Sequence, residues 1–281
     1  MIKIGEYNTL KCIRESDLGY MLSDGKDEVL MHYKQSMKKL SENEEVKVFI
    51  YSDKEKRPTA TMLPPLATIS QAGLVSVIDV LPNVGVFVSI NTPKDILVSK
   101  DYLPYDSELW PQIGDKLLIR LKLKGDILTA KPLNRYEIKE LKSEHKYADF
   151  EHVDGYVCRI LEKGIGVVTI HNVYAFIPDS QFRGKLRLGQ LVNCCITKSI
   201  DGECYATLNP VKEELVDTDK QILLDYLKTH NGQMNFTAKS NAKEIESEFH
   251  MSRKAFKRAY GGLYKERLIY FDEEKTFLIK K

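Results

Sequence analysis

A diverged threefold repeat constrains the fold of this 281-residue chain more than any other feature. Three similar short segments, residues 57–62, 126–131 and 203–208, each carry an alanine as the fourth or fifth residue, and these alanines stand 70 and 76 residues apart. An alternating apolar run precedes each segment. Further upstream, each unit has a glycine-led apolar stretch, which begins at Gly19, Gly85 and Gly166. The chain is therefore expected to hold three copies of one small module.

The composition of each unit favours strands. The apolar runs are four to seven residues long, rich in β-branched and aromatic residues, and separated by Asn, Gly and Asp. Each unit holds five such runs in about 65 residues. Five short strands close most economically into a Greek-key barrel, which removes the exposed edges of an open sheet.

After residue 210 the apolar period changes from two to about 3.6. Residues 218–221 have the pattern of a capping box and predict the start of a helix, and a stripe of Ile222, Leu223, Tyr226 and Leu227 follows. A second helix is predicted to start near Asn241, with Ile245 and Phe249 inward, and a third after Ser252. A strand, turn and strand then span residues 268–279. Three helices and a terminal hairpin predict a winged helix.

The order of motifs in each unit resembles the RNA-binding repeat of ribosomal protein S1, which is an OB-fold. Three such units and a helical tail resemble the bacterial conserved virulence factor B family over nearly the whole chain. The resemblance implies a mainly β multidomain protein, with three tandem five-stranded OB-fold barrels and an α/β winged-helix domain. It also implies a role in controlling gene expression after transcription. The expected bounds are 1–63, 66–131 and 151–210 for the barrels, 132–150 for a charged linker that forms a short helix, and 213–281 for the winged helix.

The third helix of the tail is predicted to present a basic face to nucleic acid. At about 100° per residue, five cations fall within one arc: Arg253, Lys254, Lys257, Arg258 and Lys265. The apolar residues of the helix, which are Phe256, Ala259, Tyr260 and Leu263, fall on the other side. Gly261 lies inside the basic arc, where a phosphate can approach the backbone. The acidic turn at residues 272–274 disfavours duplex DNA.

On the barrels, the resemblance places a base-stacking aromatic at Phe87, with Met21 and Val168 at the equivalent positions of the first and third units. Tyr102 extends this predicted platform. A loop of the third unit interleaves cations with an aromatic, through Phe182, Arg183, Lys185 and Arg187. We therefore expect single-stranded RNA as the preferred partner, with DNA as an alternative.

Other classes of function lack sequence support. A net charge of +2 excludes binding by bulk charge alone. No phosphate loop, nucleophile elbow or metal-spaced His or Cys set occurs, and Gly164 to Gly166 is interpreted as a strand bulge. We expect no catalysis, metal or cofactor. The absence of a signal peptide and of a long apolar run predicts a cytoplasmic protein without a membrane partner.

Three alternatives stay open at the level of sequence. The winged helix could read duplex DNA in a transcription regulator while the barrels only pack. The chain could instead be a protein-interaction scaffold of the RNA-processing or translation machinery. A ribonuclease would need a carboxylate cluster that the sequence does not show.

Overall fold

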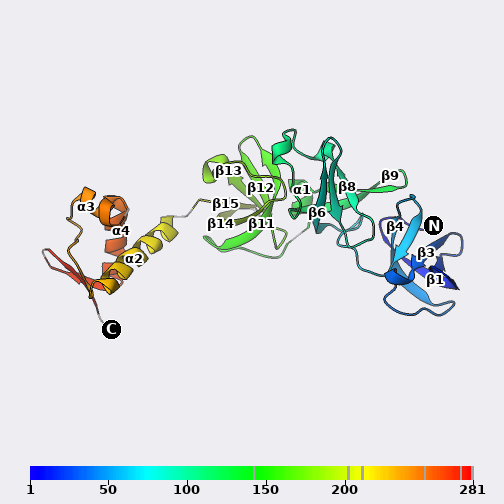
Figure 1. Cartoon of the computed structure of the whole chain (residues 1–281), viewed down its shortest axis with the longest axis horizontal. Coiled ribbons are helices and arrows are strands. Elements are labelled where there is room, and N and C mark those ends of the chain that lie inside the picture. Colours follow the sequence, from blue (N-terminus) through cyan, green and yellow to red (C-terminus); the bar gives the residue numbers. More distant parts are fainter. Residues whose placement is uncertain (142, 201–202, 210–211, 250, 273, 280–281) are drawn as a thin grey trace. The chain divides into compact units, whose positions relative to one another are not determined.

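The fold is described from a computed structural model that covers residues 1–279 except 142, 201–202, 210–211, 250 and 273, and only the backbone at 212–218. The chain divides into two compact units, Met1–Leu208 and Asn209–Lys281. Both are drawn in Figure 1, and each is described here by itself.

The first unit holds three closed five-stranded barrels, which confirms the predicted fold class. In each barrel the strand order is first, second, third, fifth, fourth, and the third and fifth strands pair in parallel. The strands of the first barrel are β1 (Tyr7–Ser16), β2 (Gly19–Ser23), β3 (Glu28–His32), β4 (Glu45–Ser52) and β5 (Pro58–Thr61). Those of the second are β6 (Gly73–Leu81), β7 (Gly85–Ser89), β8 (Ile96–Ser99), β9 (Lys116–Lys124) and β10 (Ile127–Pro132). Those of the third are β11 (His152–Leu161), β12 (Gly164–Thr169), β13 (Tyr174–Pro178), β14 (Leu191–Ile200) and β15 (Glu203–Thr207).

One device recurs at the start of the second strand of every barrel. Gly19, Gly85 and Gly164 have positive φ, and a Cβ on each would lie 2.1 to 2.3 Å from a carbonyl oxygen of the third strand. The first strand opposite carries a register shift, which in the third barrel falls between Val157 and Arg159. The predicted bulge at Gly164 to Gly166 is therefore wrong, because these residues belong to the regular strand β12 and the irregularity lies in its partner.

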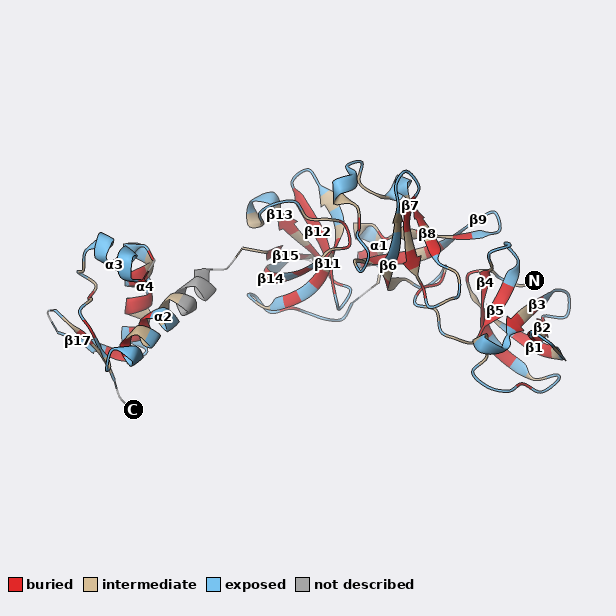
Figure 2. Ribbon diagram, in the orientation of Figure 1, coloured by how far each residue is buried: buried red, intermediate tan, exposed pale blue. Residues whose placement is uncertain are grey.

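Each barrel encloses its own apolar core, which Figure 2 shows as buried segments along the strands. The short helix α1 (Arg135–Lys139) lies between the second and third barrels, and Ile138 packs with Leu118 and Tyr174 in a small separate cluster. Glu203 of β15 accepts hydrogen bonds from Arg135 and Lys139, which hold the pKa of its carboxyl below the ordinary value of 4.5. The predicted charged linker thus contains a helix that is pinned to the third barrel.

The second unit has the winged-helix arrangement that the sequence predicts. Its elements are α2 (Lys212–Thr229), β16 (Gln233–Met234), α3 (Ala242–Phe249), α4 (Arg253–Lys265), β17 (Ile269–Phe271) and β18 (Thr276–Leu278), with sheet order β16-β18-β17. The predicted inward residues of α3 and α4 are all buried. In α4 the Ser252 hydroxyl caps the helix by accepting a hydrogen bond from the Ala255 N–H at 3.2 Å.

Three details of this unit differ from the sequence prediction. Helix α2 begins at Lys212, six residues before the proposed cap, because helix-favouring residues precede Thr218, whose side chain lies outside the described residues. Ile222 is exposed, and of the four residues in the predicted stripe only Leu223 and Leu227 are fully buried. The two-residue strand β16 was not predicted, since a bridge this short leaves no periodic signal.

Candidate nucleic-acid interface

The outer face of the second barrel presents one row of side chains across its strands. Phe87 of β7 is half-buried, whereas its neighbours Val86 and Val88 point into the core. The strand register places Asp79 on one side of Phe87, and Leu97, Thr129 and Lys122 in sequence on the other. This is the face of the second and third strands with which OB-folds bind oligonucleotides. Phe87 therefore stands where a base could stack.

The same row in the third barrel differs from what the sequence suggested. The residue equivalent to Phe87 is Gly166, two positions after Gly164, whereas the predicted equivalent, Val168, is buried in a packed cluster. A Cβ at Gly166 would lie 2.5 Å from the Tyr174 hydroxyl, so the Tyr174 ring occupies the space over this glycine. The predicted alignment of Val168 with Phe87 is therefore wrong.

In the third barrel the aromatic side chains of this row come from the next two strands, β13 and β15. Phe176 pairs with Gly166, and Tyr205 pairs with Phe176, with their ring centroids 6.3 Å apart in a T-shaped contact. The Lys198 Nζ lies 5.2 Å from the centroid of the Tyr205 ring, and the exposed Arg159 stands at the other end of the row. Two partly exposed rings between two cations are a surface suited to a single strand. Sequence analysis missed all four residues, because it shifted the register of β12 by two.

The first barrel lacks such a surface. Its equivalent row begins with Arg14, which forms an ion pair with Glu28 at 2.9 Å, and continues through Met21. The row ends at Thr59 and Tyr51, which are both buried. Tyr51 packs in one cluster with the core of the second barrel. The face that could bind a ligand is partly used for packing.

The predicted basic loop, Phe182 to Arg187, contacts the second barrel. Its Phe182 packs against the core of the third barrel. The Lys185 Nζ lies 2.6 Å from a carboxylate oxygen of Glu108, which raises the pKa of Lys185, and the Arg187 Nε lies 3.2 Å from Asp115. Arg183 is exposed and makes no ion pair with the described residues. The loop thus offers one available cation to a ligand rather than three.

The other predicted residue of the second barrel, Tyr102, lies in the short 3₁₀ helix Lys100–Tyr102, which follows β8. Its side chain is partly exposed, but it does not belong to the row that contains Phe87. The structure therefore does not bring these two predicted aromatics together in one row.

Helix α4 presents its five predicted cations on the surface. Arg253, Lys254, Lys257 and Arg258 line a shallow depression, and Lys265 is exposed as the last residue of the helix. The Arg258 guanidinium is 4.0 Å from a carboxylate oxygen of Asp219, at the outer limit of an ion pair. A Cβ added at Gly261 would meet no atom within 4 Å, so the gap in the basic face is open.

An aromatic pair extends this basic face. Tyr264 falls at about 20° on the helical count that starts at Arg253, inside the basic arc, and is 54% exposed. Its ring centroid lies 5.3 Å from that of Phe271 in β17, which is 49% exposed. Sequence analysis missed Tyr264, although the count that placed the cations also places this residue. Rings and cations therefore share one side of α4.

The turn between β17 and β18 is acidic, as the sequence indicates. The Asp272 carboxylate accepts hydrogen bonds from the backbone N–H groups of Glu274 and Lys275, which lower the pKa of Asp272. This carboxylate is consequently ionised at neutral pH and would repel a phosphate backbone.

Chemical groups suited to catalysis are sparse. Among the described residues no cluster of three His, Cys, Asp or Glu side chains is arranged to hold a metal ion. All five cysteines are free thiols, and burial raises the pKa of Cys194 to about 12, which suppresses the nucleophilic thiolate. None of the described helices is long and apolar enough to cross a bilayer.

Comparison with known protein families assigns three segments of the chain. Residues 4–63 match the model of the S1 domain, residues 73–126 that of the CvfB first S1-like domain, and residues 221–278 that of the CvfB-like winged helix domain. The first segment coincides with the first barrel, the second covers strands β6 to β9 of the second barrel, and the last covers most of the winged helix.

Similar proteins come from several bacteria. The uncharacterized protein YitL of Bacillus subtilis is 34% identical over 276 residues, which cover 97% of this chain and 93% of that protein. Conserved virulence factor B of Staphylococcus epidermidis is 29% identical over 244 residues, covering 85% and 81%. A crystal structure of a multidomain protein with nucleic acid binding domains from Streptococcus pneumoniae aligns with a TM-score of 0.69 and 29% identity over 98% of both chains.

Proposed function

This chain belongs to the conserved virulence factor B family, and from this premise we propose that it binds single-stranded RNA in the cytoplasm and controls gene expression after transcription, without catalysis. The observation that supports this proposal is the outer face of α4. There, five cations surround an open gap at Gly261, and the half-exposed ring of Tyr264 lies among them. Cations neutralise phosphates, and flat rings stack on unpaired bases.

The rings favour a single strand over a duplex. In a duplex the bases are stacked on each other, so Tyr264 and Phe271 would find backbone and base edges but no free base face to stack on. An unpaired strand exposes the faces of its bases, and each stack contributes about 1–3 kcal/mol. The ionised Asp272 beside β17 adds repulsion that a rigid duplex cannot avoid as easily as a flexible strand. The rows of the second and third barrels offer further stacking groups of the same kind.

The number of cations sets a measurable salt dependence. If the five cations of α4 each neutralise one phosphate of a single strand, they contribute about 3.5 to the slope of log K against log salt. Fluorescence anisotropy with a labelled 12-nucleotide RNA, and with a duplex DNA of the same length, measures this slope at several salt concentrations. The Lys257→Ala variant is expected to lower it by about 0.7 and to weaken binding at low salt.

A matched control comes from the first barrel. Lys26 is exposed in the turn between β2 and β3, and the Lys26→Ala variant is expected to leave the slope unchanged. A Lys257→Ala slope equal to that of the unmodified chain would remove α4 from the interface. Failure of the full chain to bind RNA at low salt would remove the proposed function itself.

One observation favours a second candidate. The third helix of a winged-helix fold, which is α4 in this chain, is the helix that usually enters the DNA major groove in transcription regulators. This alternative predicts that duplex DNA binds more tightly than single-stranded RNA in the same assay, and that Tyr264→Ala changes neither affinity.

A further inference from the structure

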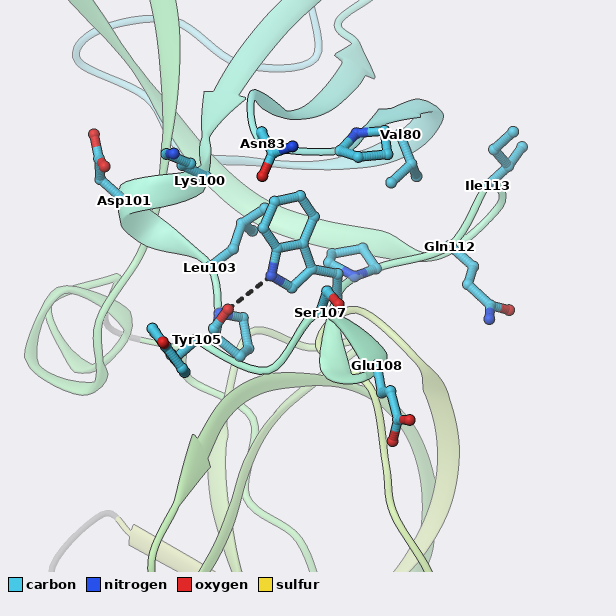
Figure 3. Close-up of a pocket in the computed structure, with 14 residues that line it drawn as sticks. Val80, Asn83, Lys100, Asp101, Leu103, Tyr105, Ser107, Glu108, Gln112 and Ile113 are labelled. Carbon is cyan, nitrogen blue, oxygen red and sulfur yellow. Dashed lines mark hydrogen bonds between the residues drawn. The ribbon is translucent and has the colours of Figure 1, made fainter.

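A depression at one end of the second barrel is built around Trp110, the single tryptophan of the chain (Figure 3). Its wall on one side is the end of β6, with Val80, and the β6–β7 turn, with Asn83, and on the other the long connection from β8 to β9. Three of its lining residues are prolines, at positions 82, 104 and 111. None of these residues belongs to the row of side chains that contains Phe87.

The indole is held in place before any ligand arrives. Its Nε1–H donates to the carbonyl oxygen of Pro104 at 2.7 Å, which is the dashed line in Figure 3. Trp110, Leu103 and Val80 also pack against the core of the second barrel. The connection itself is braced by side-chain caps, since Asp106 accepts from the Glu108 N–H at 2.9 Å. A ligand would therefore meet a rigid surface and cost little ordering entropy.

Apolar side chains at the rim are uncovered. Tyr105 is fully exposed, Ile113 is 69% exposed, and Leu81 and Val84 of the adjoining turn are also exposed. Several exposed apolar side chains next to a concave site are typical of a site that binds a partner.

The charges around the depression select against nucleic acid. Residues 100–115 contain one basic side chain, Lys100, and four acidic ones. Glu108 and Asp115 are engaged by cations of the third barrel, while Asp101 is exposed and makes no ion pair with the described residues. Phosphates would be repelled, and a cationic side chain would be attracted.

Hydrogen-bond donors around the indole are also available. The side-chain amides of Asn83 and Gln112 and the hydroxyl of Ser107 make no hydrogen bond with the described residues. A polyproline II segment suits this set, because its backbone carbonyls have no internal partners and its rings pack on aromatic and proline side chains. We propose that the Trp110 depression docks a proline-containing extended segment of another protein, with a Lys or Arg of that segment directed to Asp101.

Trp110 itself reports binding, since its emission is the only tryptophan signal of the chain. The full chain is titrated with a decaproline peptide that has one arginine at each end, and the emission of Trp110 is recorded. We expect a saturable change with a Kd below about 1 mM. Tyr105→Ala should weaken binding about fivefold or more, as loss of an aromatic contact does. Asp101→Asn should weaken binding of this peptide about two- to fivefold, and it should not change the binding of a decaproline peptide without arginine.

Controls separate this site from the RNA interface. Tyr136→Ala removes another exposed tyrosine, on α1, and should leave peptide binding unchanged. Binding of the 12-nucleotide RNA should persist in Tyr105→Ala. An emission that the peptide leaves unchanged, or an equal affinity in Tyr105→Ala, would overturn the proposal. A 12-nucleotide RNA that displaces the peptide and shifts the Trp110 emission would overturn it in favour of a nucleobase site.

Discussion

Replacing Gly261 by alanine tests the structure of α4 and the use of its basic face in one variant. Gly261 is the ninth residue of a 13-residue helix, its φ is not positive, and an added Cβ meets nothing within 4 Å. The methyl group therefore costs no steric strain. Alanine is favoured over glycine in a helix interior by about 0.8–1.0 kcal/mol, so Gly261→Ala should stabilise the winged helix by roughly this amount.

The expected gain corresponds to a rise of about 3–8 °C in the Tm of a domain of this size. Circular dichroism at 222 nm on the full chain follows it, because α2, α3 and α4 contain most of the helical residues that the structure describes. Gly262→Ala is the matched control. There the Cβ would lie 2.5 Å from Cε of Lys220, whose Nζ pairs with Glu266 at 2.6 Å, so displacement of that side chain should offset part of the gain.

Affinity for RNA should move in the opposite direction to stability. If a phosphate approaches the backbone at Gly261, the methyl group keeps it at a distance and weakens binding by about two- to fivefold, a loss of roughly 0.4–1 kcal/mol. A lower Tm would refute the helical geometry and the open space at this residue. A higher Tm with unchanged affinity for the 12-nucleotide RNA would refute the approach of a phosphate to Gly261.

Four further variants test the barrels. Phe176→Ala and Tyr205→Ala should each weaken RNA binding by about 1–3 kcal/mol in the anisotropy assay, without changing the salt slope. Gly85→Ala should destabilise the second barrel by on the order of 4 kcal/mol, because its Cβ would lie 2.1 Å from a backbone oxygen. Gly25→Ala, whose Cβ would meet nothing within 4 Å, is the control and should cost about 1 kcal/mol. Urea unfolding measures both changes. The pKa of Glu203 is lower in the folded than in the unfolded chain, so its ion pairs stabilise fully above about pH 4.5 and this contribution disappears as the pH falls through the folded pKa. Unfolding of Glu203→Gln, measured from pH 7 to pH 3, should lack that part of the acid dependence.

The sequence predicted the architecture well, because alternation, turn residues and a recurring glycine act locally. The register of β12 could not be obtained in this way. Gly164 and Gly166 are two residues apart, so both point to the same face of the strand, and alternation cannot distinguish them. What distinguishes them is a close approach in three dimensions: the Cβ of Gly164 would meet a backbone oxygen of Ile177, whereas that of Gly166 would meet the Tyr174 side chain.

The basic loop of the third barrel shows a second limit of sequence reasoning. A cation-rich loop with an aromatic has the composition of a phosphate contact, and composition was all that the sequence offered. The partner of Lys185 is Glu108, which lies 77 residues earlier in the chain. No local pattern reports such a pair. Tyr264 is a different case, since the helical count that placed the five cations of α4 also places its ring among them.

The three barrels separate the residues that maintain the fold from those that could select a ligand. The glycine at the start of the second strand and the register shift opposite it recur in all three copies, because the close approach of the third strand requires them. The outward rows share no such requirement. The row contains Met21 in the first barrel, Phe87 in the second, and Phe176 and Tyr205 in the third. A common fold therefore does not imply a common ligand, and the capacity to stack bases has to be assigned barrel by barrel, from the row and not from the repeat.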